Sequence, residues 1–278
     1  MSSFTLIDSQ AIDHINVDNR GLAYGDGVFE TMKVANNTIE LFDLHLERLQ
    51  HGCERLAIGV DIEALRADIA LLLSANDARL GVIKVIITRR STGRGYKAAL
   101  NLKGHRIVSI EPLVSSYSYE QERGVALRLC GTRLGINPRL AGIKHLARLE
   151  NVIARSEWDD PSIAEGLMLD TDGRLIEGTM SNIFLVKQGV LYTPDLQRCG
   201  VEGVVRRYIM ESVAPSLDLH IKVKDLSLDD VYQSEELFIC NSLIGVLPVI
   251  ALGCHLKSVG VVSKQVQLGF AQGVQHSV

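Results

Sequence analysis

The spacing of hydrophobic positions over the first 112 residues predicts a mixture of strands and helices. Residues 28–34 (VFETMKV) predict a strand, and a turn at Asn36-Asn37 leads into a second strand. A helix is expected from about Asp43, whose side chain suits the N-cap, and another over 61–73, where apolar residues recur at helical spacing. Residues 81–90 and 106–113 are rich in β-branched side chains and predict two further strands.

The pattern beyond residue 124 predicts mainly strands: residues 125–134, a hairpin around Asp172-Gly173, a hairpin over 182–194 and paired strands over 235–251. Helices are expected from about Val204 and near 226–232. The polar stretch 113–124 is the best linker, so we expect a small α/β domain over 1–112 and a larger domain over 125–278. The helices are too irregularly placed for a doubly wound parallel sheet. The prediction is therefore an α+β fold whose second domain is barrel-like.

Residues 141–158 (AGIKHLARLENVIARSEW) predict a helix with Leu146, Leu149 and Ile153 on one apolar stripe. Lys144 would lie at its start, where a positive charge opposes the helix dipole. One interpretation is an ordinary solvated lysine. The other is an amine whose pKa is lowered from about 10.4 by the helix end and by partial burial, ready to form an imine.

Composition excludes several classes of function. The 278 residues carry a net charge of −4, 5% aromatic residues and no Lys/Arg run longer than two, which argues against a nucleic-acid partner. Five cysteines without CxxC spacing argue against a structural zinc site or a disulfide framework, and favour a reducing compartment. The N-terminal residues do not resemble a signal peptide, and polar residues interrupt the apolar stretch 237–254. We therefore expect a cytoplasmic protein with no metal and no membrane partner.

Local motifs narrow the chemistry. The chain has no GxGxxG after its first strand, no GxxxxGK[ST], no HExxH and no GxSxG. Gly203 immediately precedes an amphipathic helix, an arrangement that suits an anion, although an ordinary loop glycine explains it equally. The segment ICNSLIG also ends a strand in small polar residues, among them a hydroxyl that can meet an oxyanion.

Taken in order, several blocks resemble the fold-type IV enzymes that use pyridoxal 5'-phosphate. This group includes branched-chain aminotransferases, D-amino-acid aminotransferases and 4-amino-4-deoxychorismate lyases. The resemblance rests on NRGLAYGDGVFET, LHLERL, GIKHLARLENVIARSEW, GRLIEGTMSNIF, GVEGVVRR and NSLIGVLPV. Within the group, RRSTGRGY, RLGINPRLAGIKHLARLE and ICNSLIGVLPV are most similar to the lyases.

The resemblance implies a set of cofactor ligands. Lys144 would form the Schiff base with pyridoxal 5'-phosphate, and Glu177 would bond the protonated pyridine nitrogen. Four further groups join the Arg48 side chain at the phosphate, namely the backbone N–H of Val204, of Val205 and of Leu243, and the hydroxyl of Ser242. A dianionic phosphate suits a guanidinium, a hydroxyl and backbone N–H groups, so these roles are chemically reasonable.

The lyase interpretation also implies roles toward the substrate. The reaction converts 4-amino-4-deoxychorismate to 4-aminobenzoate and pyruvate, a step of folate biosynthesis, with Lys144 removing the C4 proton. Thr31 would hydrogen-bond the departing oxygen. Arg94 and Tyr96 are candidates for binding a substrate carboxylate, although Arg94 could equally be a solvated loop residue.

Two positions leave the substrate open. Ala147 stands where many lyases have asparagine, and Glu30 stands where some have a second threonine. The main alternative is a D-amino-acid or branched-chain aminotransferase that uses the same lysine, glutamate and arginine. A second alternative is a non-catalytic member of the group. Members of the group are typically homodimers, so a homodimer acting on a small molecule is expected.

Overall fold

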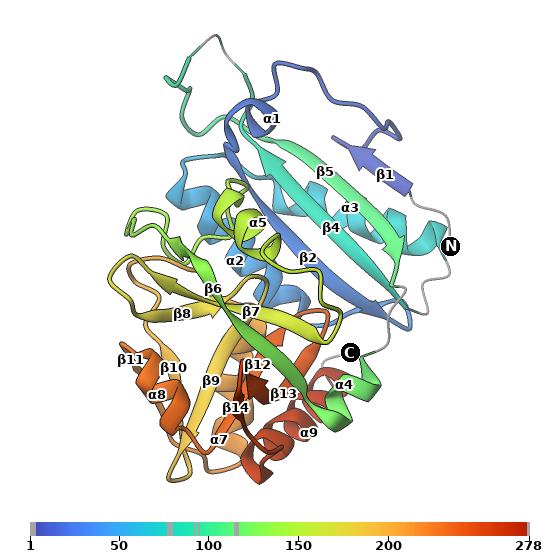
Figure 1. The fold of residues 1–278 in the computed structure, drawn as a ribbon. Helices are drawn as coiled ribbons and strands as arrows, with labels where there is room; N and C mark the ends of the chain where they lie inside the picture. Colours follow the sequence, from blue (N-terminus) through green and yellow to red (C-terminus); the bar gives the residue numbers. More distant parts are fainter. Residues whose placement is uncertain (1–3, 77–79, 92, 94, 114–116, 277–278) are drawn as a thin grey trace. The chain divides into compact units, whose positions relative to one another are not determined.

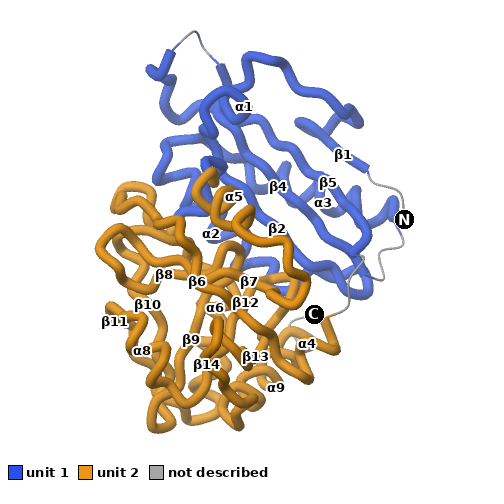
Figure 2. Tube along the Cα trace, in the orientation of Figure 1, with its two compact units in different colours: residues 1–115, 143–147 blue, residues 116–142, 148–278 orange. Residues whose placement is uncertain are grey.

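The computed structural model describes residues 4–76, 80–91, 93, 95–113 and 117–276. The chain divides into two compact units. Unit 1 contains residues 1–115 and 143–147, and unit 2 contains residues 116–142 and 148–278 (Figure 2). The five residues 143–147, placed by sequence in the second domain, therefore belong by their contacts to the first unit.

Unit 1 is built on an antiparallel sheet with the strand order β1-β5-β4-β2-β3. Its hairpin turn at Asn36 and Asn37 has both residues at positive φ, 50° and 60°, which matches the twist that two-residue hairpin turns require. The strands, seen in Figure 1, are β1 (Phe4–Ile7), β2 (Gly27–Ala35), β3 (Thr38–Ile39), β4 (Leu80–Thr88) and β5 (His105–Pro112).

Three helices accompany this sheet: α1 (Arg20–Tyr24), α2 (Phe42–Arg55) and α3 (Ile62–Ala75). Helix α3 begins as expected, because the Asp61 side chain accepts a 3.1 Å hydrogen bond from the N–H of Ala64. The expected cap of α2 was wrong. Leu41 occupies the N-cap position of α2. Asp43 lies in the first turn, and its carboxylate forms an ion pair with Arg66 at 2.8 Å.

The two faces of β2 have different environments. Val28, Met32 and Val34 are buried in the hydrophobic core that the sheet forms with α2 and α3. Phe29 and Thr31 alternate with them and are only half-buried on the opposite face. Each buried aliphatic side chain contributes about 1.5–3 kcal/mol, so this alternation determines the register of β2.

Unit 2 is built on a mixed sheet with the strand order β11-β10-β9-β12-β13-β6-β7-β8, and β14 pairs with β13. Strand β8, at one end of this order, also contacts β9 and β10, so the sheet curls round on itself. Its strands are β6 (Val125–Leu134), β7 (Ile163–Asp170), β8 (Leu175–Gly178), β9 (Asn182–Lys187), β10 (Val190–Pro194), β11 (Ile221–Lys224), β12 (Glu236–Asn241), β13 (Gly245–Leu252) and β14 (His255–Leu256).

The helices of unit 2 are mostly short. The segments α6 (Val204–Tyr208), the π-helical η1 (Ile209–Val213) and α7 (Ala214–Ser216) follow one another without a break. A capping box of Ser227 and Asp230 starts α8. The remaining helices are α4 (Ser118–Arg123), which occupies part of the expected linker, α5 (Leu149–Arg155), α8 (Leu228–Gln233) and α9 (Val261–His276), which the sequence pattern did not reveal.

The architecture confirms the predicted α+β class, with one antiparallel sheet unit and one unit whose sheet curls like part of a barrel. The inner face of the curled sheet is lined by aliphatic side chains from all its central strands, including Leu127, Leu167, Leu185, Ile239 and Val249. This rigid apolar framework supports the strand ends and turns on which the polar residues of unit 2 lie.

Candidate active site

Lys144 does not begin a helix, and this part of the sequence interpretation was wrong. Helix α5 starts only at Leu149, and residues 143–147 instead run beside β2. The N–H of Phe29 donates to the carbonyl of Lys144 at 3.0 Å, and the N–H of Leu146 donates to the carbonyl of Gly27 at 3.0 Å. The backbone of Lys144 is therefore fixed by a strand rather than by a helix end.

The side chain of Lys144 lies against the half-buried face of β2. Its Nζ is 4.2 Å from the centroid of the Phe29 ring. Thr31 follows on the same face two residues later, because strand side chains alternate. The Lys144 amine lies against the Phe29 ring, and the same face of β2 presents the Thr31 hydroxyl. Both groups are well placed to act on a bound small molecule.

Arg48 belongs to a buried cluster behind that strand. The carboxylate of Glu30, 1% exposed, accepts from Arg48 Nε at 2.8 Å and Nη2 at 2.5 Å, and its Oε2 lies 2.6 Å from His45 Nδ1. Burial raises the pKa of Glu30, but the charge of Arg48 and the hydrogen bonds to Arg48 and His45 outweigh it and bring the pKa down to about 2. Glu30 is thus a permanent anion that fixes the plane of the guanidinium.

His45 links this cluster to Lys144. Burial lowers the pKa of the imidazole, and the positive charges of Arg48 and Lys144 lower it further, against the opposing effect of Glu30. A neutral imidazole that faces a carboxylate through Nδ1 carries its proton on that nitrogen. Its Nε2 is buried and has no hydrogen-bond partner among the described residues. Arg48 and Lys144 therefore both lie close enough to His45 to lower its pKa.

Glu177 is the corresponding anion of unit 2. It lies in β8, is buried, and its Oε2 accepts a 2.8 Å hydrogen bond from the N–H of Val201. Burial lowers the pKa of the nearby Arg148 guanidinium, and the negative charge of Glu177 opposes this effect. The backbone donor and the guanidinium both favour an ionised carboxylate, as a partner for a protonated ring nitrogen requires.

The residues before α6 are held close to Glu177. Asn182 donates from Nδ2 to the carbonyl of Val201 at 2.9 Å. A Cβ atom added to Gly203 would lie 1.9 Å from Asn182 Oδ1, so any larger residue here requires the Asn182 side chain to move. Gly203 is the N-cap of α6 and offers no side chain to the first N–H groups of the helix, those of Val204 and Val205.

The turn between β12 and β13 carries Ser242, half-buried, and Leu243. Asn241 Oδ1 accepts from the N–H of Leu243 at 2.9 Å and from that of Ile244 at 3.0 Å, and its Nδ2 donates to the carbonyl of Met180 at 3.1 Å. The N–H of Leu243 thus already has an acceptor, and a phosphate there would have to share it.

Sequence reasoning missed Glu165, which is 3% exposed in β7. Its carboxylate accepts from the hydroxyl of Thr179 at 2.5 Å and from its N–H at 3.1 Å, from the N–H of Met180 at 3.0 Å and from the hydroxyl of Ser181 at 2.9 Å. The N–H of Gly166 is a fifth donor at 2.9 Å. Glu165 therefore shapes the turn after Glu177. An acid inside the apolar strand IAEGLMLD was the available signal.

Lys84 was also missed. It lies on β4 directly opposite Thr31 in the antiparallel register and is exposed. Directly opposed residues share a face of the sheet, so the Lys84 and Thr31 side chains leave the sheet side by side on the same face. The available signal was a lone lysine in the apolar strand GVIKVIIT. Of the two sequence candidates for a substrate carboxylate, Arg94 lies outside the described residues and Tyr96 is 87% exposed in unit 1.

The residues expected at the cofactor divide between the units: Lys144 and Arg48 in unit 1, and Glu177, Val204, Val205, Ser242 and Leu243 in unit 2. The donor set fits pyridoxal 5'-phosphate. It contains a lysine amine, a buried carboxylate for the ring nitrogen, and a guanidinium and hydroxyl for the phosphate. Gly203 precedes the N–H groups of Val204 and Val205, which no side chain caps, and such groups suit an anion.

Other classes of site find no support. No group of three or more His, Cys, Asp or Glu residues that could hold a metal ion occurs in the part of the chain that the structure describes. Over the same residues, no helix has the length and apolar character needed to cross a bilayer. The five cysteines are free thiols, four of them buried.

Comparison with known proteins places these features in a family. An aminodeoxychorismate lyase from Vibrio harveyi is 37% identical over 85% of this chain and 86% of its own. The crystal structure of a 4-amino-4-deoxychorismate lyase from Pseudomonas aeruginosa matches 96% of this chain and 98% of its own, with 41% identity and a TM-score of 0.92.

Aminotransferases are more distant. A D-alanine aminotransferase from Bacillus licheniformis is 24% identical over 86% of this chain and 83% of its own. A branched-chain aminotransferase from Thermoproteus uzoniensis shares the fold, with a TM-score of 0.87 at 21% identity over 99% of this chain and 96% of its own. The family model described as amino-transferase class IV matches residues 27–252. This chain belongs to the class IV aminotransferase family.

Proposed function

We propose that this protein is an aminodeoxychorismate lyase that uses pyridoxal 5'-phosphate. It would convert 4-amino-4-deoxychorismate to 4-aminobenzoate and pyruvate. The observation that carries the proposal is the end-to-end similarity to a lyase of solved structure, at 41% identity over 96% of the chain. Two branched-chain aminotransferases of known structure share the fold at only 18% and 21% sequence identity.

The reaction breaks two bonds of the substrate, C4–H and the C3–O bond to the enolpyruvyl group. The C4 proton goes to a base, and the enolpyruvyl group leaves with the C3–O electron pair and takes up a proton to become pyruvate. No water or oxidant is consumed. Bound pyridoxal 5'-phosphate supplies an electron sink for the pair released at C4.

Lys144 is the proposed base at C4. Its backbone is fixed to β2 by two hydrogen bonds, one from the N–H of Phe29 to the carbonyl of Lys144 and one from the N–H of Leu146 to the carbonyl of Gly27, so only the side chain is free to move. The Phe29 ring, 4.2 Å from Nζ, limits where the amine can lie. A base that is held near its target gains most of its effect from positioning.

Thr31 and Lys84 are proposed to act on the substrate. A threonine hydroxyl can donate to the oxygen that leaves C3, where negative charge develops. The opposed ammonium of Lys84 suits one of the two carboxylates of aminodeoxychorismate. Both roles are supported by position, because Thr31 and Lys84 lie on the same face of the sheet as Phe29, which Lys144 contacts.

The cofactor would be held by Arg48, Glu177, the N–H groups of Val204 and Val205, and Ser242. Glu30 supports the role of Arg48, because it occupies Nε and Nη2 and so fixes the guanidinium. Glu177 would keep a ring nitrogen protonated. The N–H of Val201 supports that role by holding the carboxylate in one orientation.

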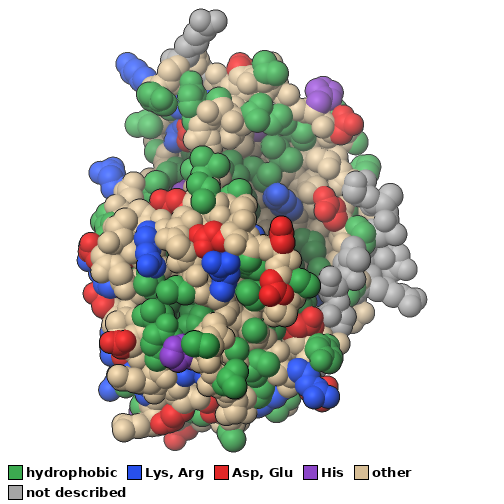
Figure 3. All heavy atoms as spheres, viewed as in Figure 1, with side chains coloured by type: hydrophobic (Ala, Val, Ile, Leu, Met, Phe, Trp, Pro, Cys, Tyr) green, Lys and Arg blue, Asp and Glu red, His purple; other side chains and the backbone are tan. Residues whose placement is uncertain are grey.

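A homodimer is proposed on the basis of α5. Leu149, Val152 and Ile153, at spacing i, i+3 and i+4, are 74%, 58% and 57% exposed, and two of them, Leu149 and Ile153, belong to the predicted apolar stripe. Figure 3 shows hydrophobic side chains at the surface in this region. Exposed apolar patches of this kind mark interfaces. Free thiols throughout the described chain support a reducing compartment, the cytoplasm.

The test is 4-aminobenzoate fluorescence after aminodeoxychorismate is mixed with the purified protein and pyridoxal 5'-phosphate. Lys144→Ala should abolish the signal, whereas Lys103→Ala, a surface lysine paired with Asp61, should retain it. A cofactor-binding protein that forms no 4-aminobenzoate would contradict the proposal. Turnover of D-alanine or of branched-chain amino acids would then identify the aminotransferase alternative.

A further inference from the structure

A cavity of about 590 Å³ lies in unit 1, where the end of β1, the loop that follows it, the residues after β4 and the start of β5 meet. This volume is within the range of pockets that bind small molecules. None of the residues that line it has a role in the proposed chemistry, so the proposed function leaves the cavity unexplained. Charged, polar and aliphatic residues line it, among them Asp8, Ile12, Ile15, Asp18, Arg90 and His105.

A tight turn fixes Asp8 at the cavity. Asp8 and Ser9 have φ values of 48° and 68°, and the N–H of Ile7 donates to the carbonyl of Gln10 at 2.8 Å. This is the backbone of a two-residue hairpin turn, which aspartate tolerates better than most residues. The N–H of Asp8 donates to the carbonyl of Arg106 at 2.9 Å, and its Oδ1 accepts from the N–H of Arg106 at 3.0 Å. The main chain of β5 therefore holds this carboxylate in place.

Asp8 in turn orients two residues of the cavity. Its Oδ2 accepts from Arg90 Nη2 at 2.9 Å and lies 2.9 Å from His105 Nδ1. Burial raises the pKa of Asp8, but the bonds to Arg106 and His105 and the charge of Arg90 outweigh it and lower the pKa. Arg90 Nε donates to the carbonyl of Lys103 at 2.9 Å. Arg90 Nη1 and His105 Nε2 have no hydrogen-bond partner among the described residues, so both atoms are available to a ligand.

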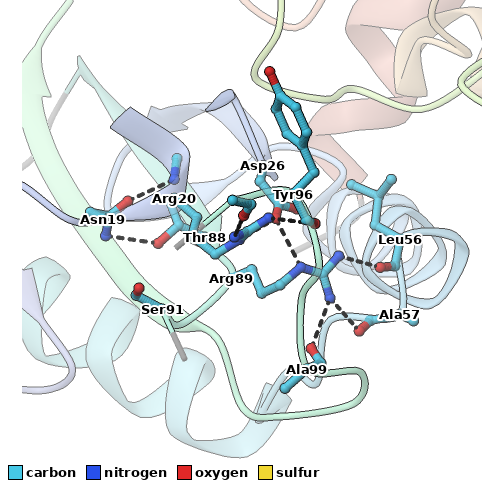
Figure 4. A network of polar contacts seen from close by, with 12 residues as sticks. Asn19, Arg20, Asp26, Leu56, Ala57, Thr88, Arg89, Ser91, Tyr96 and Ala99 are labelled. Atoms are coloured by element: carbon cyan, nitrogen blue, oxygen red, sulfur yellow. Dashed lines mark hydrogen bonds and ion pairs between the residues drawn. The ribbon is translucent and has the colours of Figure 1, made fainter. Parts of the chain in front are cut away.

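The main chain that carries Arg90 is firmly held. The preceding residue, Arg89, is 6% exposed and donates to Asp26 Oδ2 at 2.9 Å and to two main-chain carbonyls (Figure 4). Asn19, a buried residue of the cavity wall, donates to the Thr88 hydroxyl at 3.1 Å, as Figure 4 also shows. A wall that is already ordered loses little entropy when a ligand binds.

Asp18 adds a group of the opposite charge to the lining. It is exposed, and its carboxylate has no hydrogen bond or ion pair with any residue that the structure describes. Ile12 is half-buried and Ile15 is 38% exposed, and both add aliphatic surface. The cavity therefore presents a guanidinium, a carboxylate and an apolar surface to one ligand.

We propose that this cavity binds a small carboxylic acid that also carries an amino group. Arg90 Nη1 donates to the carboxylate of the ligand, Asp18 accepts from its amino group, and its hydrocarbon part lies against Ile12 and Ile15. A dianion such as phosphate suits the cavity less, because Asp8 and Asp18 both repel it. The site does not depend on the proposed function. Two kinds of compound have the required chemistry, namely 4-aminobenzoate and α-amino acids with apolar side chains.

Calorimetric titration of the wild-type holoenzyme with 4-aminobenzoate and with L-leucine tests the site. At least one of them should bind with a dissociation constant below about 1 mM. Its analogue without the amino group, benzoate or 4-methylpentanoate, should bind about fivefold more weakly. Binding of 4-aminobenzoate alone would identify the product of the proposed reaction as the occupant, and binding of L-leucine alone would identify an amino acid. Failure of both to bind, or equal affinity for the analogue, would overturn the proposal.

Two substitutions assign the binding to this cavity. Arg90→Gln should weaken it by about tenfold and Asp18→Asn by about fivefold, because each removes one charged contact. The controls are Arg66→Gln, at a surface arginine paired with Asp43, and Asp13→Asn. Asp13 lies on the same loop as Asp18, but its side chain is 99% exposed and does not line the cavity. Neither control should change the affinity, and an unchanged affinity in either cavity variant would overturn the proposal.

A local signal separates this site from binding at the cofactor. The imidazole ring protons of His105 can be assigned in NMR spectra by their absence in His105→Gln, and they should shift when the ligand is added to the holoenzyme. Those of His51, exposed in α2 and outside the cavity, should not shift. A His105 signal that saturating ligand leaves unchanged would contradict the proposal. Neither readout uses turnover, so the result is independent of the proposed lyase activity.

Discussion

Replacing Glu165 by glutamine tests whether one buried carboxylate organises the turn that follows Glu177. The carboxylate accepts five hydrogen bonds, and all come from uncharged donors. Glutamine can keep its oxygen toward Gly166 and Thr179, but its amide nitrogen then faces the N–H of Met180. Two donors cannot bond each other, so the N–H of Met180, an exposed residue, loses its protein acceptor.

The cost follows from these contacts. Losing the acceptor of an N–H that water can reach costs less than the full burial penalty, and most of the effect comes from the surviving bonds, which lose their charge assistance. We expect Glu165→Gln to lower the free energy of unfolding by about 2 kcal/mol, which corresponds to a fall in Tm of about 4–8 °C for a unit of this size. Because Met180 also bonds Asn241 beside Ser242, the affinity for pyridoxal 5'-phosphate should fall by about tenfold.

Thermal unfolding of the apoprotein and spectroscopic titration with the cofactor measure the two effects. Glu211→Gln is the matched control, because Glu211 is an exposed acid paired with Arg207 on the next helical turn and should shift Tm by less than about 1 °C. A Glu165→Gln variant with the Tm and the cofactor affinity of the wild type would refute the reasoning.

Three further predictions concern other parts of the molecule. The Glu30 pKa is depressed to about 2, so its contribution to stability should persist above pH 4.5 and be lost as the pH falls toward 2; acid unfolding of Glu30→Gln should lack this component. Thr31→Val should reduce kcat by about 10²-fold with little change in cofactor affinity, measured by steady-state kinetics; an unchanged kcat would exclude its role. Leu149→Asp should convert the dimer to a monomer, as measured by sedimentation. A wild-type protein that is itself a monomer would contradict the proposed interface at α5.

Sequence periodicity was sufficient for the framework of the fold. Strand β2 and helix α3 were predicted because their apolar residues alternate or recur every three to four positions, and burial in the structure follows the same pattern. Helix α9 was not predicted, although its Val266 and Phe270, four residues apart, are both buried. Patterns reveal elements most reliably where a single face is buried.

The region around Lys144 shows where such reasoning fails. Leu149 and Ile153 have helical spacing, but their side chains are exposed, and residues 143–147 adopt an extended pairing with β2 instead. This pairing depends on a strand more than 100 residues earlier, and local sequence does not contain that information. The family resemblance nevertheless singled out the lysine, since motif recognition does not depend on the secondary structure assigned to it.

The polar residues that support the site were the hardest to predict. Glu165 lies inside an apolar strand and bonds residues 14–16 positions later, and Lys84 is the single charged residue of β4. Asp26 likewise has its partner, Arg89, 63 residues later, just after β4. A charged residue in an apolar strand signals that a partner exists, but only the fold identifies it.

The most direct test of the central claim is the stoichiometry of products from the wild-type holoenzyme. Aminodeoxychorismate should yield 4-aminobenzoate and pyruvate in a one-to-one ratio, without an added keto acid and with the cofactor recovered as pyridoxal 5'-phosphate. Recovery of pyridoxamine 5'-phosphate with no 4-aminobenzoate would show that the protein transfers the amino group instead, and would contradict the account.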